Sequence, residues 1–537
     1  MVCSTRSGIY SFKQEDKYSF LSNLPVKINL FKSMLTVSGM TGLSRVFGLI
    51  RDVIIASFFG AGLGVDAFIV AFRIPNFLRR LFAEGGFSQA FVPVISEYKE
   101  RRTHNDVQAL VDQTSATLAL VLSVTTVAGV LAAPVLVMLF APGFIGDADK
   151  QALTTAMLRI TFPYIFFISL TALAGGVLNT YRRFAVPAFT PVLLNLSLIA
   201  CAIWLAPEFT QPVVALAWGV FIAGVVQLLF QFPFLLRLRL FPRPGLNRDR
   251  EGVRRIFGLL VPTLFAISIT QINLLVDTLI ASFLVTGSIS WLYFSDRLVE
   301  FPLGVFGIAL ATVILPSLSG EYAKGSQASY RKTLDWALRW VVLIALPAAF
   351  GLALLAPAML ATIFQYQAFT AHDVRMAGLS LEGYAVGLPA FILIKVLATG
   401  FFSRQDTRTP VKIGVIAMFS NIFLNLLLVV PLAHAGLALA TSLAAYVNAG
   451  LLYIYLRKQQ YYLAEPGWGR YLTKAGIAVA AMSLMLYTLL PGIDSWLAWD
   501  LFSRVGRLLL WIGAGASVYF SVVWLTGIRP REMTAHP

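Results

Sequence analysis

The sequence predicts an all-α polytopic membrane protein with about fourteen transmembrane helices, built as two six-helix lobes followed by two C-terminal helices. Three observations predict this class: a strongly apolar composition, apolar segments that alternate with charged loops, and a repeat with a constant offset. Of the 537 residues, 58% are hydrophobic and 13% are charged, and the mean hydropathy is +0.77. Soluble domains are about half apolar and about a quarter charged, so a bundle of membrane helices accommodates this composition best.

The apolar segments are each long enough to cross a bilayer. They centre near Leu49, Phe72, Thr125, Phe167, Leu196, Ile222, Ile269, Phe306, Ile344, Leu393, Phe419, Ala444, Met482 and Ala516.

The loops between these segments sort by charge. Loops rich in Lys and Arg, such as EYKERRTHND, alternate with loops nearly free of them, such as GAGLGVD and PLAHAG. Because positive loops stay in the cytoplasm, both termini are predicted to be cytoplasmic. The same bias accounts for the net charge of +16 without a nucleic-acid partner. Two cysteines and four scattered histidines indicate neither a disulfide framework nor a metal cluster.

A repeat divides the chain, because four pairs of similar segments lie 222 to 225 residues apart. The segments that begin at Ile54, Phe91, Pro187 and Ala215 recur at Leu279, Ile314, Pro410 and Ala438. Both halves begin on the same side of the membrane, so the repeat is parallel. Such halves enclose a central site and rock about it, which gives alternating access.

The predicted domains follow from the spans and the repeat. They are a cytoplasmic N-terminal tail (1–30, without signal-peptide features), an N-lobe with spans one to six (31–240), a C-lobe with spans seven to twelve (241–460), and a final helix pair with a short cytoplasmic C-terminus (461–537).

The first span, residues 34–60, carries charges that a membrane helix rarely tolerates. A charge at the bilayer centre disfavours insertion by about 2.5–3.5 kcal/mol. Arg45, Arg51 and Asp52 share a wedge of about 140° with small and polar residues at a helical pitch of about 100° per residue. This wedge predicts one wall of a polar cavity.

Further buried charges follow on two other helices. Asp66 and Arg73 lie seven residues apart on the second helix, with Arg79 turned about 100° from their face. Arg297 and Glu300 share one side of the eighth helix. Arginine stays charged when buried and binds phosphate in a bidentate manner, so the excess of arginine predicts a site for an anionic, phosphate-bearing substrate. The alternative is that these charges pair and only hold helices together.

The chain shows no phosphate-binding loop of an ATPase and no catalytic constellation, which favours a transporter driven by an ion gradient or the membrane potential over an enzyme. Asp277 on the seventh helix is a lone buried carboxylate. Asn421, Asn425 and Thr441 could join it in a monovalent cation site, and a structural hydrogen-bonding role accounts for them equally well. The last two helices are rich in small residues, which favour close packing or an apolar groove for a lipid tail.

Four segments carry a resemblance to a known family: SRVFGLIRD (44–52), DAFIVAFRIPNFLRRLFAEGGFSQAFVPV (66–94), SDRLVEFPLGVFGIALATVILPSLS (295–319) and FFSRQDTRTPVKI (401–413). With these the sequence resembles the MurJ/MviN family from about residue 31 to the C-terminus. The resemblance implies a lipid II flippase of the bacterial inner membrane, within the multidrug/oligosaccharidyl-lipid/polysaccharide exporter superfamily. Its substrate would be undecaprenyl-diphosphate-linked disaccharide pentapeptide, moved to the periplasmic leaflet for peptidoglycan synthesis.

The resemblance also implies site residues. The substrate-handling positions would be Arg45, Arg51, Asp52, Asp66, Arg73, Arg79, Arg297 and Glu300. The sodium site of some members would match Asp277, Asn421, Asn425 and Thr441, and no other cofactor is expected. Expected partners are lipid II, membrane lipids and other cell-wall synthesis proteins. In the expected mechanism Arg45, Arg51 and Arg297 grip the diphosphate while Asp52 and Glu300 pair with them in alternating states.

Three alternatives stand beside this interpretation. A drug/cation antiporter of the same superfamily should have twelve spans and a cavity of acids and aromatics. A polysaccharide-unit flippase also handles lipid diphosphates, but the extra helix pair and the motifs argue against it. A structural scaffold for cell-wall enzymes should tolerate neutral replacement of the buried arginines.

Overall fold

The computed structural model describes residues 26–81, 87–243 and 250–528, and over these ranges it consists of helices and turns without a strand. The predicted all-α class is confirmed. Most of the predicted N-terminal tail, residues 1–25, lies outside the described residues, as do residues 529–537.

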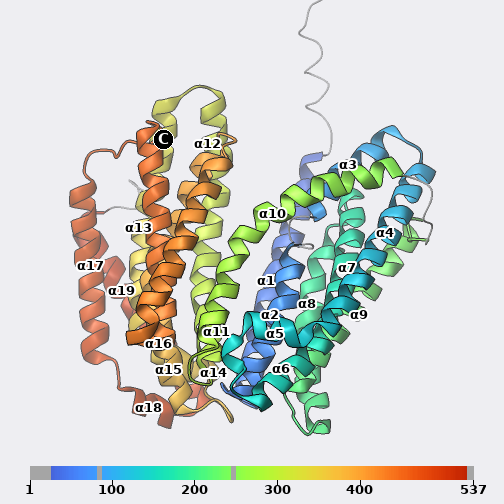
Figure 1. Ribbon diagram of the computed structural model, residues 1–537. Helices are drawn as coiled ribbons and strands as arrows, with labels where there is room; N and C mark the ends of the chain where they lie inside the picture. Colours follow the sequence, from blue (N-terminus) through green and yellow to red (C-terminus); the bar gives the residue numbers. More distant parts are fainter. Residues whose placement is uncertain (1–25, 82–86, 244–249, 529–537) are drawn as a thin grey trace, which may run out of the picture.

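The first half of the chain forms one bundle (Figure 1). Its helices are α1 (Val26–Phe59), α2 (Leu63–Leu81), α3 (Phe87–Arg101), α4 (His104–Leu131), α5 (Ala133–Phe140), η3 (Pro142–Phe144), α6 (Ala148–Thr161), α7 (Tyr164–Thr180), α8 (Ala185–Ala200), η4 (Cys201–Leu205), η5 (Ala206–Glu208) and α9 (Val214–Arg237).

The helix α10 (Arg250–Ala281) packs against α3 of the first bundle and α16 of the second, and so links the two. The second bundle contains α11 (Ser288–Pro302), η6 (Leu303–Gly307), α12 (Ile308–Ala323), α13 (Gln327–Leu354), α14 (Ala356–Phe364), α15 (Ala371–Phe402), α16 (Arg408–Lys458), α17 (Trp468–Leu489), α18 (Ile493–Ala498) and α19 (Leu501–Leu525).

All fourteen predicted apolar segments fall on helices. Ten continuous helical stretches of the described chain are long and apolar enough to cross a membrane. One of them, α16, has 51 residues and contains the centres of two predicted spans. Its backbone is non-helical at Ala433, where φ is +48°, in the predicted loop PLAHAG. At about 1.5 Å per residue a straight helix of this length would be more than twice as long as a bilayer core is thick, so α16 is two spans joined at a kink.

The repeat is visible as two buried carboxylates in equivalent places. Asp112 on α4 accepts a hydrogen bond from the backbone of Arg243 (2.8 Å), in the segment that follows α9. Asp335 on α13, at the offset of the repeat, accepts one from the Tyr462 hydroxyl (2.9 Å), in the segment that follows α16. Each carboxylate therefore holds the segment that follows the last helix of its repeat.

The two bundles meet at one end and diverge toward the other (Figure 1). We call the end at which they meet the closed end. Contacts there join the Ser57 carbonyl to the Ala368 amide (2.9 Å) and the Gly143 amide to the Ser282 hydroxyl (3.0 Å). Arg45 on α1 and Glu300 on α11 are exposed.

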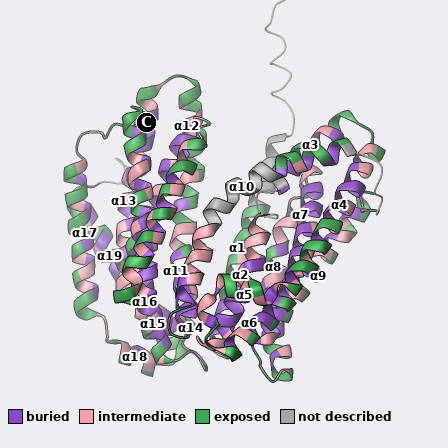
Figure 2. Ribbon diagram, viewed as in Figure 1, coloured by how far each residue is buried: buried purple, intermediate pink, exposed green. Residues whose placement is uncertain are grey.

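Exposed residues follow the outward surfaces of both bundles, and buried residues fill their interiors (Figure 2). Large apolar side chains such as Leu131 and Val430 are among the exposed ones. Apolar side chains on an outer surface are expected where lipid is the solvent, so this surface fits a protein embedded in a bilayer.

Candidate functional site

Arg51 and Asp52 form the centre of a buried polar cluster between the bundles. Arg51 Nη2 lies 2.7 Å from Asp52 Oδ1, and Arg51 Nη1 donates to Asn195 Oδ1 on α8 at 3.0 Å. From the other bundle, the Tyr293 hydroxyl on α11 donates to Asp52 Oδ1 at 2.8 Å. Asp52 is only 1% exposed. The predicted polar wedge of the first span is thus the wall that faces α8 and α11.

Arg297 completes the cluster from α11. Its Nε lies 3.5 Å from Asp52 Oδ2, its Nη1 donates to Glu300 Oε2 at 2.7 Å, and its guanidinium lies over the Tyr293 ring at 4.8 Å. Asp52 therefore sits between two arginines that come from different bundles. The Arg297 and Glu300 side chains are 29% and 48% exposed, so this part of the cluster is open to solvent.

Arg45 reaches the other bundle as well. It is exposed, and its guanidinium lies against Gly304 of η6, where a Cβ atom would be 1.9 Å from Arg45 Nη1. Only glycine leaves room for this approach. The structure therefore places Arg51 and Arg297 beside Asp52, Arg297 beside Glu300, and Arg45 against η6.

Asp66 lies at the closed end, where it caps a helix of the opposite bundle. Its carboxylate accepts from the Gly287 amide (2.7 Å) and from the amide and hydroxyl of Ser290 (2.9 and 2.6 Å), at the N-terminus of α11. Lys150 Nζ on α6 is 3.5 Å away. A carboxylate satisfies the free amides of a helix N-terminus, so Asp66 joins α2 to α11.

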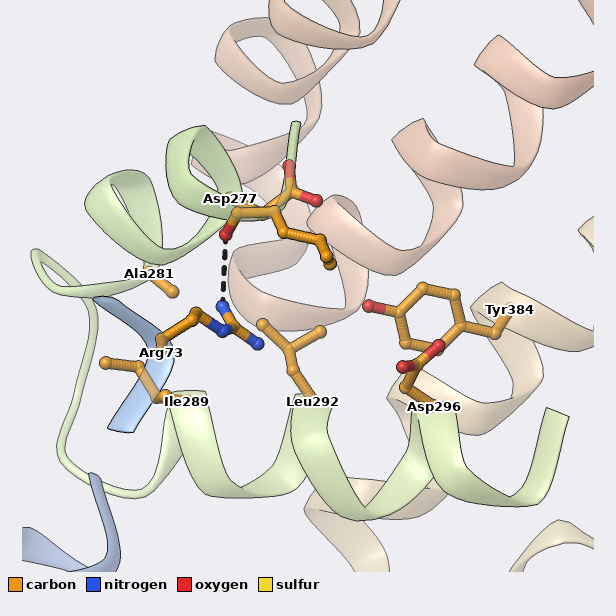
Figure 3. A pocket seen from close by; sticks show the side chains of 8 residues that line it. Arg73, Asp277, Ala281, Ile289, Leu292, Asp296 and Tyr384 are labelled. Atoms are coloured by element: carbon orange, nitrogen blue, oxygen red, sulfur yellow. Dashed lines mark hydrogen bonds between the residues drawn. The ribbon is translucent and has the colours of Figure 1, made fainter. Parts of the chain in front are cut away.

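The Arg73 side chain on α2 reaches across to α10 (Figure 3). Its Nη1 donates to the Leu274 carbonyl (3.2 Å) and to the Thr278 hydroxyl, both on α10. It lines a cavity of about 30 Å³ together with Asp277, Asp296 and Tyr384. Arg79 donates to Asn76 Oδ1 (2.8 Å) on its own helix.

The four residues of the predicted cation site do come together. Asn425 Nδ2 lies 2.7 Å from Asp277 Oδ1 and 3.0 Å from Asn421 Oδ1, and Asn421 Nδ2 lies 3.3 Å from the Thr441 hydroxyl. The two asparagines are buried. Within the described residues, Asn425 Oδ1 is a buried oxygen with no hydrogen-bond partner. The set offers one carboxylate and neutral oxygens, which are the donors that hard cations prefer.

The last two helices are attached to the second bundle at both ends. At one end Asp335 Oδ1 accepts from Trp468 Nε1 (2.6 Å) in addition to Tyr462. Burial first, and then the negative charge of Asp335, raise the pKa of the Tyr462 hydroxyl, which keeps it protonated as a donor. At the other end, buried Arg504 on α19 donates to the Ala361 carbonyl at 3.0 Å.

Sequence reasoning missed several of these residues. Tyr293, Asn195 and Lys150 carry no motif, and their roles depend on which helices pack together. Asp335 could have been found, because it stands at the repeat offset from Asp112.

Comparison with known proteins identifies the family. A family model described as lipid II flippase MurJ matches residues 55–509. A curated relative from Vibrio cholerae serotype O1, named probable lipid II flippase MurJ, is 46% identical over 517 residues, covering 95% of this chain and 98% of the relative. This chain belongs to the MurJ family.

Other relatives and solved structures agree with the MurJ assignment. The lipid II flippase MurJ of Burkholderia cenocepacia is 43% identical over 94% of this chain and 98% of its own length. A solved structure of lipid II flippase MurJ in an inward closed conformation has a TM-score of 0.77 and 25% identity, covering 91% of this chain and 98% of that one. An inward-facing MATE transporter of the MOP superfamily shares the fold, with a TM-score of 0.64, 13% identity and coverages of 79% and 98%.

Proposed function

We propose that this MurJ family protein is a lipid II flippase of the bacterial inner membrane. It moves undecaprenyl-diphosphate-linked disaccharide pentapeptide from the cytoplasmic to the periplasmic leaflet by alternating access. Beyond family membership, the observation that carries the proposal is the buried carboxylate of Asp52 between Arg51 and Arg297, which come from different bundles. Arg45 reaches the second bundle at Gly304.

The diphosphate is the group that this cluster fits. Arg45, Arg51 and Arg297 bring three guanidinium groups to the facing surfaces of the two bundles. The Nε of Arg297 is buried and faces Asp52 Oδ2 at 3.5 Å, but it makes no hydrogen bond to any residue that the structure describes. Guanidinium groups bind phosphate oxygens through paired donors. A diphosphate would therefore engage Arg45 and Arg297 and replace Glu300 as a partner of Arg297.

The closed end is the periplasmic end in this proposal. The loops that meet there, 60–62, 141–147 and 282–287, carry no Lys or Arg, and such loops lie outside the cytoplasm. Both termini are then cytoplasmic and the arginine cluster opens inward. Outward opening requires Asp66 to leave the N-terminus of α11, because that contact joins the two bundles at the closed end.

A monovalent cation is the proposed coupling ion, as an alternative to the membrane potential alone. Asp277, Asn421, Asn425 and Thr441 would hold it, and their support is the unpartnered buried oxygen of Asn425. When bound, the cation supplies one positive charge beside Asp277. The membrane-spanning helices α17 and α19 would offer the apolar surface for the lipid tail, and other cell-wall synthesis proteins would be partners of the flippase in the membrane.

The experiment that tests the proposal measures lipid II on the outer leaflet of spheroplasts after depletion of this protein. Exposure of lipid II should fall on depletion and return with the wild-type chain. Unchanged exposure on depletion would refute the flippase function. A scaffold for cell-wall enzymes would instead be supported if neutral variants of Arg45 and Arg297 restored exposure as well as the wild type.

A further inference from the structure

The small cavity around Arg73 is lined by three charged side chains (Figure 3). It holds about 30 Å³ and is lined by one guanidinium, from Arg73, and two carboxylates, from Asp277 and Asp296. A space of this size accepts about one or two water molecules or a bare ion. Carboxylates shielded from water need a counter-charge, and Arg73 is the cation that lines this cavity.

Arg73 is held at the level of Asp277 by the helix that carries Asp277. Its Nη1 donates to the Leu274 carbonyl (3.2 Å) and to the Thr278 hydroxyl, which flank Asp277 within one turn of α10. Asp277 at the same time accepts from Asn425 at 2.7 Å, on the side of the proposed cation site. Asp277 therefore lines the Arg73 cavity and also contacts the proposed cation site.

We propose that Arg73 is a tethered counter-ion that takes the place of a mobile monovalent cation at Asp277 while the closed end is shut. The inference rests on the cation site proposed above and adds that Arg73 determines when the cation binds there. Arg73 already places a positive charge at Asp277, and it repels a second positive charge that enters this poorly solvated space. A cation therefore binds strongly only after Arg73 withdraws.

Withdrawal of Arg73 accompanies opening of the closed end. Asp66 and Arg73 lie seven residues apart on one face of α2, and both reach across to the helices at the closed end, α11 and α10. Separation of α2 from these helices breaks both contacts and leaves Asp277 and Asp296 without Arg73. A cation that then binds at Asp277 stabilises the open arrangement. By linkage, opening raises the affinity for the cation to the same extent.

The first test measures sodium binding by the full-length protein in detergent, with radioactive Na⁺ and with the Na⁺-dependent rise in melting temperature against choline chloride. Arg73→Gln should bind Na⁺ about tenfold or more tightly than the wild type, because it removes a like charge from the site. Arg73→Lys keeps the charge and should bind like the wild type. Adding Asp277→Asn to Arg73→Gln should abolish the gain.

The matched control is Arg159→Gln, which removes the same charge from an exposed position of α6. It should leave Na⁺ affinity unchanged. If Arg73→Gln gains no affinity, or if its gain survives Asp277→Asn, the proposal is overturned. Lipid II is not present in this assay, so failure here leaves the flippase function untouched, and failure of lipid II transport leaves this result valid.

The second test follows the closed end directly. In a variant with Cys3 and Cys201 replaced by serine, Ser282→Cys places a thiol where the Ser282 hydroxyl contacts the Gly143 amide across the bundles. Na⁺ should increase its labelling by a membrane-impermeant thiol reagent, and Asp277→Asn should remove this effect. Labelling that does not respond to Na⁺ would contradict the coupling.

Discussion

Asp66 and Ser290 join the two bundles through two hydrogen bonds to one carboxylate oxygen, from the Ser290 amide at 2.9 Å and from its hydroxyl at 2.6 Å. The two residues are 224 positions apart in the chain. Because Asp66 is 1% exposed and belongs to α2, whereas Ser290 lies in the first turn of α11, opening of this end must expose and break both bonds. The contact is therefore a latch between the bundles.

Replacement of this latch should favour opening. Asp66→Asn removes the charge that faces the α11 N-terminus and leaves Lys150 without its carboxylate. We expect a shift of about 1–3 kcal/mol toward the open arrangement. The measurement is thiol labelling of Ser282→Cys, which should increase. Asp373→Asn is the control, since Asp373 accepts from Trp291 Nε1 (2.9 Å) within a single bundle. Equal labelling in both variants would show that Asp66 is not a latch.

Loss of Arg297 should abolish lipid II transport while membrane abundance is retained. Arg297 contributes its guanidinium to the cluster with Asp52 and Glu300. Arg297→Lys should also fail, because an ammonium group cannot make the paired contacts of a guanidinium. Outer-leaflet lipid II in spheroplasts and immunoblots of membranes give the two measurements. Arg375→Ala, at an exposed position of α15, should transport normally. Transport by Arg297→Ala would reduce the cluster to a structural role.

Gly304→Ala should impair transport through Arg45. The new Cβ would lie 1.9 Å from Arg45 Nη1, so the guanidinium must move away from η6. Folding should not suffer, since Arg45 is flexible and alanine favours a helix over glycine by about 1 kcal/mol. Lipid II exposure should fall with normal protein abundance. Gly320→Ala on α12, where nothing lies within 4 Å, is the control and should be silent. Normal transport by Gly304→Ala would mean that the position of Arg45 is unimportant.

Asp335→Ala should detach the segment that leads into α17. It removes the acceptor of Tyr462 and of Trp468, and each buried donor left without a partner destabilises by about 1–3 kcal/mol. We expect a lower melting temperature and faster proteolysis at residues 459–467. The repeat supplies the comparison, because Asp112→Ala loses the bond from the Arg243 amide and should have a smaller effect. A silent Asp335→Ala would show that α17 is held by apolar packing alone.

Two groups of residues show how much of the candidate site the sequence could predict. Asn421 and Asn425 do contact Asp277 and Thr441, since a spacing of four places both amides on one face of a helix. Asp66 and Arg73 were grouped with the cationic cavity because they share a face of α2. The structure instead gives them partners on α11 and α10, since the face of a helix does not specify which helix lies opposite.

The sequence by itself determined the all-α class, the positions of the apolar helices and the repeat. Hydropathy, loop charge and a constant offset are properties of the chain, and a bilayer allows few structures other than helices. The sequence also showed that the predicted spans carry more arginine than membrane helices usually do. The tertiary structure alone decided their partners: Arg297 beside Asp52, Asp66 on the α11 N-terminus, and Arg73 beside Asp277. The reason is physical. Each of these contacts joins residues more than 200 positions apart and depends on how helices distant in the chain pack against each other.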